Sequence, residues 1–290
     1  MRVLSLGLAA IVAVLFSVNS STALMIAYSP PYQRALTAEA VVVGKVTSIE
    51  KETVEVEDVK GGPKRTYHVA LVKIDNALKG VAGLTHIKVG FIPGPEVRPG
   101  AAPGIRPIPR RGLMGPQLKE GDEFLLFLDK HNTASFHVIN GMNPPVDMKS
   151  EEAKPALEAV KKVVAVTSNP KAALTAAKAE DRFYAAAVLL MKYRQPPRGG
   201  AQVEQVAIPA DESALILKGL LEGNWEARNG NAPSAMSAIG MLGLTAKDGF
   251  QYPKIKPGQQ PGELYKKAFE KWRNGPGKDY VIKQMIVPTK

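Results

Sequence analysis

Four histidines have the widest chemical range in this chain, since a neutral imidazole can bind a metal ion or move a proton. They are His68, His86, His131 and His137, all in the first half of the sequence. Strand parity places His68 on an apolar face and His86 and His137 on polar faces, so an accidental pair across neighbouring strands could hold a metal. No carboxylate or thiol stands at ligand spacing from them. We therefore predict no metal site and no cofactor.

A dense acidic cluster at residues 50–58 is the second group of side chains that could take part in catalysis, because paired carboxylates can act as general acid and base. It consists of Glu50, Glu52, Glu55, Glu57 and Asp58. Residues 53–59 alternate strictly, which puts Glu55 and Glu57 on the solvent side of a strand. We expect a solvated charged edge that discourages pairing between molecules. A catalytic pair of carboxylates is the alternative.

The common catalytic and nucleotide-binding motifs are missing from the sequence. There is no His-Glu-x-x-His zinc motif, no Gly-x-Ser-x-Gly nucleophile turn, no Walker loop, no EF-hand loop and no dinucleotide-binding fingerprint. This favours a non-catalytic binding or interaction protein. An envelope-associated hydrolase, with its site between two domains, is the alternative.

Residues 93–117 have the most unusual composition in the chain, with seven prolines and five glycines. Such a segment cannot build a core or a regular ladder, so we expect a long exposed loop that is partly polyproline-like or disordered. It carries Arg98, Arg106, Arg110 and Arg111. Guanidinium groups bind carboxylates and phosphates in a fixed geometry. We name this segment the basic arm and predict that its four arginines bind an anionic ligand; a tolerated insertion is the alternative.

Up to about residue 150, the sequence has the two-residue periodicity of β-strands, so strands are expected to position these residues. Runs of β-branched residues and strict alternation predict six strands. Their ranges are 38–50, 53–59, 66–77, 85–91, 123–128 and 135–139. The first two should form a hairpin, and the apolar run at 123–128 suits a strand covered on both faces. Six strands with no helix among them favour a small closed or nearly closed barrel as the fold of residues 24–149.

Three segments of this half carry a resemblance. They read Ala-Val-Val-Val-Gly-Lys-Val at 40–46, Tyr-His-Val-Ala-Leu-Val-Lys-Ile-Asp-Asn-Ala-Leu-Lys-Gly at 67–80 and Glu-Gly-Asp-Glu-Phe-Leu-Leu-Phe-Leu at 120–128. In this order they resemble the OB-type barrel of netrin-like and metalloproteinase-inhibitor-like modules, in the forms found in uncharacterised exported bacterial proteins. The resemblance covers residues 38–147 and implies a barrel without an activity. Such inhibitors place an N-terminal cysteine on a protease zinc, and this chain has no cysteine.

Residues 150–290 have a helical period, which predicts an all-α second domain of five to seven helices. Helix starts are indicated at Ser150 and at Asn169-Pro170, where a capping side chain precedes proline at the first helical position. Apolar stripes predict further helices over 181–194, 214–222, 234–242, 263–273 and 278–285. Their starts are irregularly spaced, so no repeat is identified. Trp225 and Trp272 are expected in the interior; an exposed sugar-binding platform is the alternative.

Residues 1–23 have the composition of a secretory signal peptide. Met1-Arg2 is followed by an apolar run over 3–18 and then by Ser21-Thr22-Ala23, whose small side chains suit cleavage after Ala23. An uncleaved membrane anchor is the alternative, although the run is shorter than the roughly 20 residues that span a bilayer as a helix. We expect no stable membrane span after cleavage.

Cysteine content and charge limit the expected localisation of the protein and the kinds of partner that it could bind. The chain has no cysteine, which excludes disulfides and a lipoprotein signal, and its net charge is +11. Residues 247–290 hold ten basic and four acidic side chains. We expect a periplasmic or extracellular protein whose partner is a protein or an anionic polymer of the cell envelope. The exported address argues against nucleic acid.

The mature protein is expected to begin at Leu24, because cleavage after Ala23 removes the whole apolar run. N-terminal sequencing of the protein recovered from the periplasm or the medium measures this directly. A membrane-bound form that retains Met1 would contradict the prediction and favour the anchor.

Overall fold

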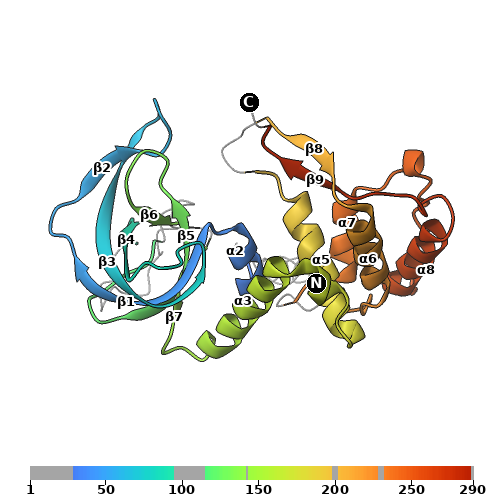
Figure 1. Ribbon diagram of the computed structural model, residues 1–290, viewed down its shortest axis with the longest axis horizontal. Coiled ribbons are helices and arrows are strands. Elements are labelled where there is room, and N and C mark those ends of the chain that lie inside the picture. The colour runs from blue at the N-terminus through green and yellow to red at the C-terminus, as the bar shows by residue number, and fades with distance from the viewer. Residues whose placement is uncertain (1–28, 95–114, 142, 198–201, 228–231, 289–290) are drawn as a thin grey trace, which may run out of the picture.

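The computed structural model describes residues 29–94, 115–141, 143–197, 202–227 and 232–288. A seven-stranded sheet occupies the first half of the chain and helices dominate the second (Figure 1). The strands are β1 (Ala40–Ile49), β2 (Val54–Glu57), β3 (Lys64–Lys79), β4 (His86–Phe91), β5 (Glu123–Lys130), β6 (His137–Ile139) and β7 (Val146–Asp147). All six predicted strands are therefore present, and the two-residue β7 is an addition.

Following the strand pairs from β1 through β3, β4, β6 and β5 returns to β1. β1 pairs antiparallel with β3 and β3 with β4, β4 pairs parallel with β6, and β6 pairs antiparallel with β5. β5 in turn pairs antiparallel with β1, in the register Ala40↔Leu128 to Lys45↔Glu123. Each of these five strands thus pairs with two others, while β2 adds to β3 and β7 adds to β5.

The hairpin predicted between residues 38–50 and 53–59 is wrong. β2 pairs with β3, in the register Val54↔Tyr67 to Glu57↔Lys64, and β1 pairs with β3 further along. β3 has 16 residues and serves both strands. Alternation reports which side chains share a face but does not identify the partner strand, so it could not distinguish β1 from β3 as the neighbour of β2.

β5 is buried on both faces, as its continuous apolar run predicts. Phe124, Leu126 and Leu128 join one apolar cluster with residues of β1, β3 and β4. Leu125 and Phe127 join a larger cluster that includes the helices of the second half. Successive side chains of a strand point to opposite faces, so this one strand contributes to two cores.

A short helix that the sequence did not predict, α2 (Pro31–Thr37), precedes β1. Lys79, at the end of β3, donates from Nζ to the backbone oxygens of Ala35 at 2.9 Å and Ala38 at 2.6 Å. A cation at the carbonyl end of a helix is favourable, and here it holds the helix on the sheet. Seven residues are too few to show a helical stripe, which is why the sequence pattern missed it.

The second half contains α3 (Ala153–Ser168), α4 (Pro170–Leu174), α5 (Ala179–Arg194), α6 (Ala210–Leu221), α7 (Ala235–Leu242), the 3₁₀ turn η1 (Ala246–Asp248) and α8 (Pro261–Arg273). The start at Asn169-Pro170 is confirmed, because Asn169 Oδ1 accepts from the Ala172 N–H at 3.3 Å. The helix start predicted at Ser150 is too early in the chain, since α3 begins at Ala153 without a side-chain cap. Within the described ranges, no helix has the length and apolar character needed to cross a membrane.

The prediction that the second half is all-α is wrong. β8 (Glu204–Ala207) and β9 (Lys283–Ile286) form an antiparallel two-stranded ribbon, so the helix predicted over 278–285 is also wrong. β9 contacts α5, and Figure 1 shows the ribbon at the end of that helix. A short apolar run is compatible with either a helix or a strand. Here pairing with β8, far away in the chain, makes residues 283–286 a strand.

The larger apolar cluster runs through both halves of the protein. It joins Tyr32 of α2 and Phe127 of β5 to Val160 of α3 and Leu189 of α5. The domain boundary predicted near residue 150 falls between β7 and α3, inside this cluster. The division into residues 24–149 and 150–290 as independent domains stays a prediction.

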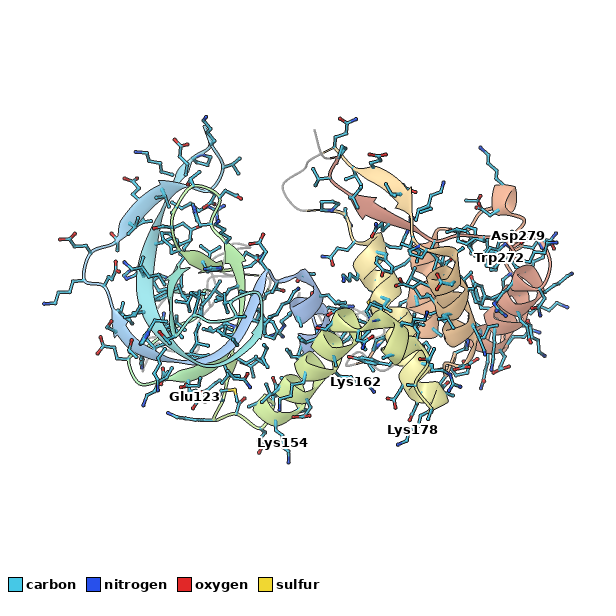
Figure 2. The ribbon with its side chains drawn as sticks, in the orientation of Figure 1. Glu123, Lys154, Lys162, Lys178, Trp272 and Asp279 are labelled. Carbon is cyan, nitrogen blue, oxygen red and sulfur yellow. The ribbon has the colours of Figure 1, made fainter. Side chains whose placement is uncertain are left out.

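Both tryptophans lie in the interior, which confirms the prediction. Trp225 is 3% exposed and Trp272 is 2% exposed. Trp272, labelled in Figure 2 near α8, stacks on Phe269 and donates from Nε1 to the Asp248 backbone oxygen at 2.8 Å. At this exposure neither ring forms a sugar-binding platform.

Replacing Phe127 by alanine should lower the free energy of unfolding by about 3–5 kcal/mol, because it removes a large side chain from a core that the sheet and helices share. Urea unfolding measures the loss. Leu84→Ala, at a side chain that is 51% exposed, is the matched control and should change stability by less than about 0.5 kcal/mol. Similar losses from both variants would contradict the burial of Phe127.

Candidate functional site

The four predicted ligand-binding arginines, Arg98, Arg106, Arg110 and Arg111, lie outside the described residues. Their role therefore stays a prediction. The structure does describe the two ends of the basic arm, which fix where it leaves the sheet and where it returns.

The two ends of the basic arm are hydrogen-bonded to each other. The Gly94 N–H donates to Gly115 O at 3.1 Å, and Gln117 Nε2 donates to Gly94 O at 2.6 Å. Glycine is required at residue 115, because a Cβ there would lie 1.5 Å from the Ile92 backbone oxygen. The arm thus starts and ends at one place, just after β4.

A cavity of about 460 Å³ lies beside these arm ends and includes Ile92, Gly115 and Pro116 in its wall. We call it the polar cavity. Its polar side chains are Glu39, Asp58, Arg65, Tyr67, Asp129, Lys130, His131, Asn132 and Asn140. They come from β3, from the end of β5 and from the adjoining loops, so the fold of the sheet gathers acidic and basic groups here.

Asp58 is the centre of a hydrogen-bond network in the polar cavity. Its carboxylate accepts from Tyr67 Oη at 2.5 Å and from Arg65 Nε at 2.7 Å. Burial raises the pKa of Tyr67 to about 12, and the hydrogen bond to Asp58 acts in the same direction. The phenol therefore stays protonated at neutral pH and serves as a donor to the carboxylate.

His131 is buried in the same network, with Nδ1 hydrogen-bonded and Nε2 buried without a hydrogen-bond partner among the described residues. Nδ1 accepts from the backbone N–H groups of Thr133 at 3.2 Å and Ala134 at 3.1 Å. The hydrogen-bond pattern therefore assigns the proton of the neutral ring to Nε2, which lies 3.6 Å from Asp58 Oδ1. A ring held this way shapes the loop after β5 and is unsuited to act as a general base.

The remaining carboxylates of the polar cavity are also held by their neighbours. Glu39 accepts from the Lys130 N–H at 2.8 Å, and Asp129 accepts from Asn140 Nδ2 at 3.5 Å. The cavity can therefore offer charge and hydrogen-bonding groups to a ligand, while its histidine and carboxylates are engaged in structure.

The other three histidines each make a different contact. His68 packs its ring near Phe91 with centroids 5.7 Å apart, and His86 contacts Thr85. Burial lowers the pKa of His137, which pairs with Val89 in the sheet. In the part of the chain that the structure describes, no three His, Cys, Asp or Glu side chains gather at a spacing that could hold a metal ion.

The acidic cluster at residues 50–58 is divided among separate contacts. Glu50 pairs with Lys88 at 2.8 Å, Glu57 accepts from the Gly61 N–H at 2.7 Å, and Asp58 belongs to the polar cavity. Glu52 and Glu55 are exposed. The predicted charged edge fits this arrangement, with the exception of Asp58, whose network the sequence did not indicate.

A second cavity, of about 470 Å³, lies where α2 meets the helices of the second half. We call it the junction cavity. Ser234 and Ser237 line it, but every histidine of the chain lies in the first half. Glu226, also in its wall, accepts from the Glu263 N–H at 2.9 Å. Among the described residues, no hydrogen bond joins either serine to the Glu226 carboxylate.

The chain matches no known protein-family model and no curated protein. Sequence reasoning missed the contact of Asp58 with His131, because the two residues lie far apart in the chain and only the fold brings them together.

Replacing His131 by alanine should destabilise the protein by about 1–3 kcal/mol, because the backbone donors of Thr133 and Ala134 lose their acceptor and a buried ring is removed. Thermal or urea unfolding measures this loss. His86→Ala, at an exposed ring, is the control and should change stability by less than about 0.5 kcal/mol. An unchanged stability in the His131 variant would contradict its structural role.

Proposed function

We propose that this protein is an exported, non-catalytic binding protein that contacts an anionic component of the cell envelope, either a polymer or an acidic protein. The proposal rests on one observation, which is that the two ends of the basic arm meet beside the polar cavity. The described ends of the basic arm meet at the wall of a preformed polar cavity, so the arm is tied to the sheet at that place. Long loops inside a compact domain are commonly functional.

The strand order supports an OB-type barrel for the first half, as the resemblance to netrin-like modules implies. Taking β1, β3, β4, β5 and β6 as strands one to five, the pairing order is one, two, three, five, four and back to one. The parallel pair in this order is β4 with β6. OB-type folds are five-stranded Greek-key barrels that bind ligands through one face and its loops.

The composition of the basic arm supports an anionic partner. Its guanidinium groups keep their charge at any physiological pH and match carboxylate or phosphate geometry. Arg65, 58% exposed in its side chain, adds a described guanidinium at the polar cavity. The signal-like residues 1–23 and the cysteine-free composition support an exported address. The alternative of an envelope hydrolase lacks a nucleophile with a base among the described residues of either cavity.

The test replaces Arg98, Arg106, Arg110 and Arg111 together by serine. Retention on an immobilised polyanion such as heparin should fall and should be salt-sensitive in the natural protein, because exposed charges are screened over roughly 10 Å at 0.1 M salt. Thermal stability should stay nearly unchanged, since exposed loop side chains contribute little.

The matched control removes the same charge from the helical half, by replacing the exposed Lys154, Lys178, Lys192 and Lys218 by serine. If the control lowers retention as much as the arginine variant, net charge explains the binding and the arm does not. Full retention by the arginine variant would instead point to the basic segment 247–290. A loss of several kcal/mol of stability would show that the arm is packed structure.

A further inference from the structure

The loop between η1 and α8 exposes apolar side chains next to lysines. Its residues 251–257 read Gln-Tyr-Pro-Lys-Ile-Lys-Pro, and we call them the lysine loop. Tyr252 is 56% exposed and Ile255 is 48% exposed. A single exposed apolar side chain is ordinary on a protein surface. Here two lie within one short loop, and Ile255 has a lysine on each side in the sequence.

Specific contacts hold the lysine loop in this form. At its start, Tyr252 Oη donates to Leu244 O at 2.9 Å. At its end, the Lys256 N–H donates to Gln259 Oε1 at 3.0 Å, and the Gln259 N–H donates to Lys256 O at 3.1 Å. The loop is therefore fixed at both ends while Ile255, between them, stays exposed.

The surroundings of the lysine loop are basic. Lys254 and Lys256 are exposed, and neither side chain has an ion-pair partner among the described residues. No aspartate or glutamate occurs over 249–262. The rings of Tyr252 and of Tyr265 in α8, which two lysines follow, have centroids 6.2 Å apart. This part of the surface therefore offers positive charge and apolar side chains together.

An anionic lipid bilayer matches this combination. Each lysine near an anionic membrane surface strengthens binding about fivefold. The interfacial layer of the bilayer also accepts tyrosine rings and aliphatic side chains. A soluble polyanion would bind the lysines but would leave Ile255 in water. The exposed apolar side chains therefore favour a bilayer as the partner.

We propose that the lysine loop docks the protein on an anionic lipid bilayer, with Tyr252 and Ile255 entering the interfacial layer and Lys254 and Lys256 binding the headgroups. α8, which contacts the loop, lies at the opposite end of the molecule from β4, where the basic arm leaves the sheet (Figure 1). Docking at the loop therefore does not depend on the anionic ligand of the basic arm.

Vesicle sedimentation tests the docking on the mature protein, expected to begin at Leu24, because the apolar run over 3–18 would bind lipid by itself. The protein should bind vesicles that contain phosphatidylglycerol at least about fivefold more tightly than vesicles of phosphatidylcholine alone. Ile255→Ser should weaken binding to the anionic vesicles by about three- to tenfold, because a large apolar side chain no longer leaves water. Leu84→Ser, at a similarly exposed residue of the first half, is the matched control and should change nothing.

Two further variants examine the charges and the depth of insertion. Lys254→Gln with Lys256→Gln should weaken binding to the anionic vesicles at least about fivefold. Lys154→Gln with Lys178→Gln, at exposed lysines of the second half, removes the same charge and is the control. Ile255→Trp should keep binding, and lipids brominated in their acyl chains should quench its new indole, whereas both natural tryptophans are buried.

The outcomes separate a bilayer from other partners. If Ile255→Ser binds vesicles like the natural protein while the lysine variant loses retention on heparin, the partner is a soluble polyanion and docking on a bilayer is overturned. Equal binding to neutral vesicles, or an Ile255→Trp indole that is not quenched, would overturn it as well. Heparin retention by Ile255→Ser should be unchanged, so a failure of the basic arm and a failure of the lysine loop are measured separately.

Discussion

The rest of the structure depends on the burial of β5 on both faces. Leu126 on one face fills the interior of the sheet, while Phe127 on the other face meets α2 and the helical half. Arg34 of α2 lies over the Phe127 ring at 5.5 Å, and Lys79 ties the end of the same helix to β3. The side chains on both faces of β5 are buried. This one strand therefore contributes to a core that the two halves share.

The polar groups of the sheet half are used mainly to hold loops in place. His131 accepts two backbone hydrogen bonds and faces Asp58, whose carboxylate also binds Tyr67 and Arg65. These contacts join the loop after β5 to the turn after β2, and they build the wall of a cavity beside the arm. These hydrogen bonds therefore shape the wall of the polar cavity.

The two cavities differ in chemistry because they arise from different kinds of contact. The polar cavity forms at strand ends, where loops bring charged side chains together, and the junction cavity is lined by residues of α2, α5 and α7 and of the segment after α6. Trp225, in the wall of the junction cavity, packs near Phe269, and its buried N–H has no acceptor among the described residues.

The sequence by itself determined the strands, most helices and the place of both tryptophans, because periodicity and composition record which side chains must be buried. It did not determine which strands pair: β2 joined β3, and residues 283–286 formed a strand with residues 204–207 where a helix was predicted. Nor did it indicate that His131 meets Asp58. Pairing and side-chain meetings depend on residues far apart in the chain, and only the tertiary structure brings those together.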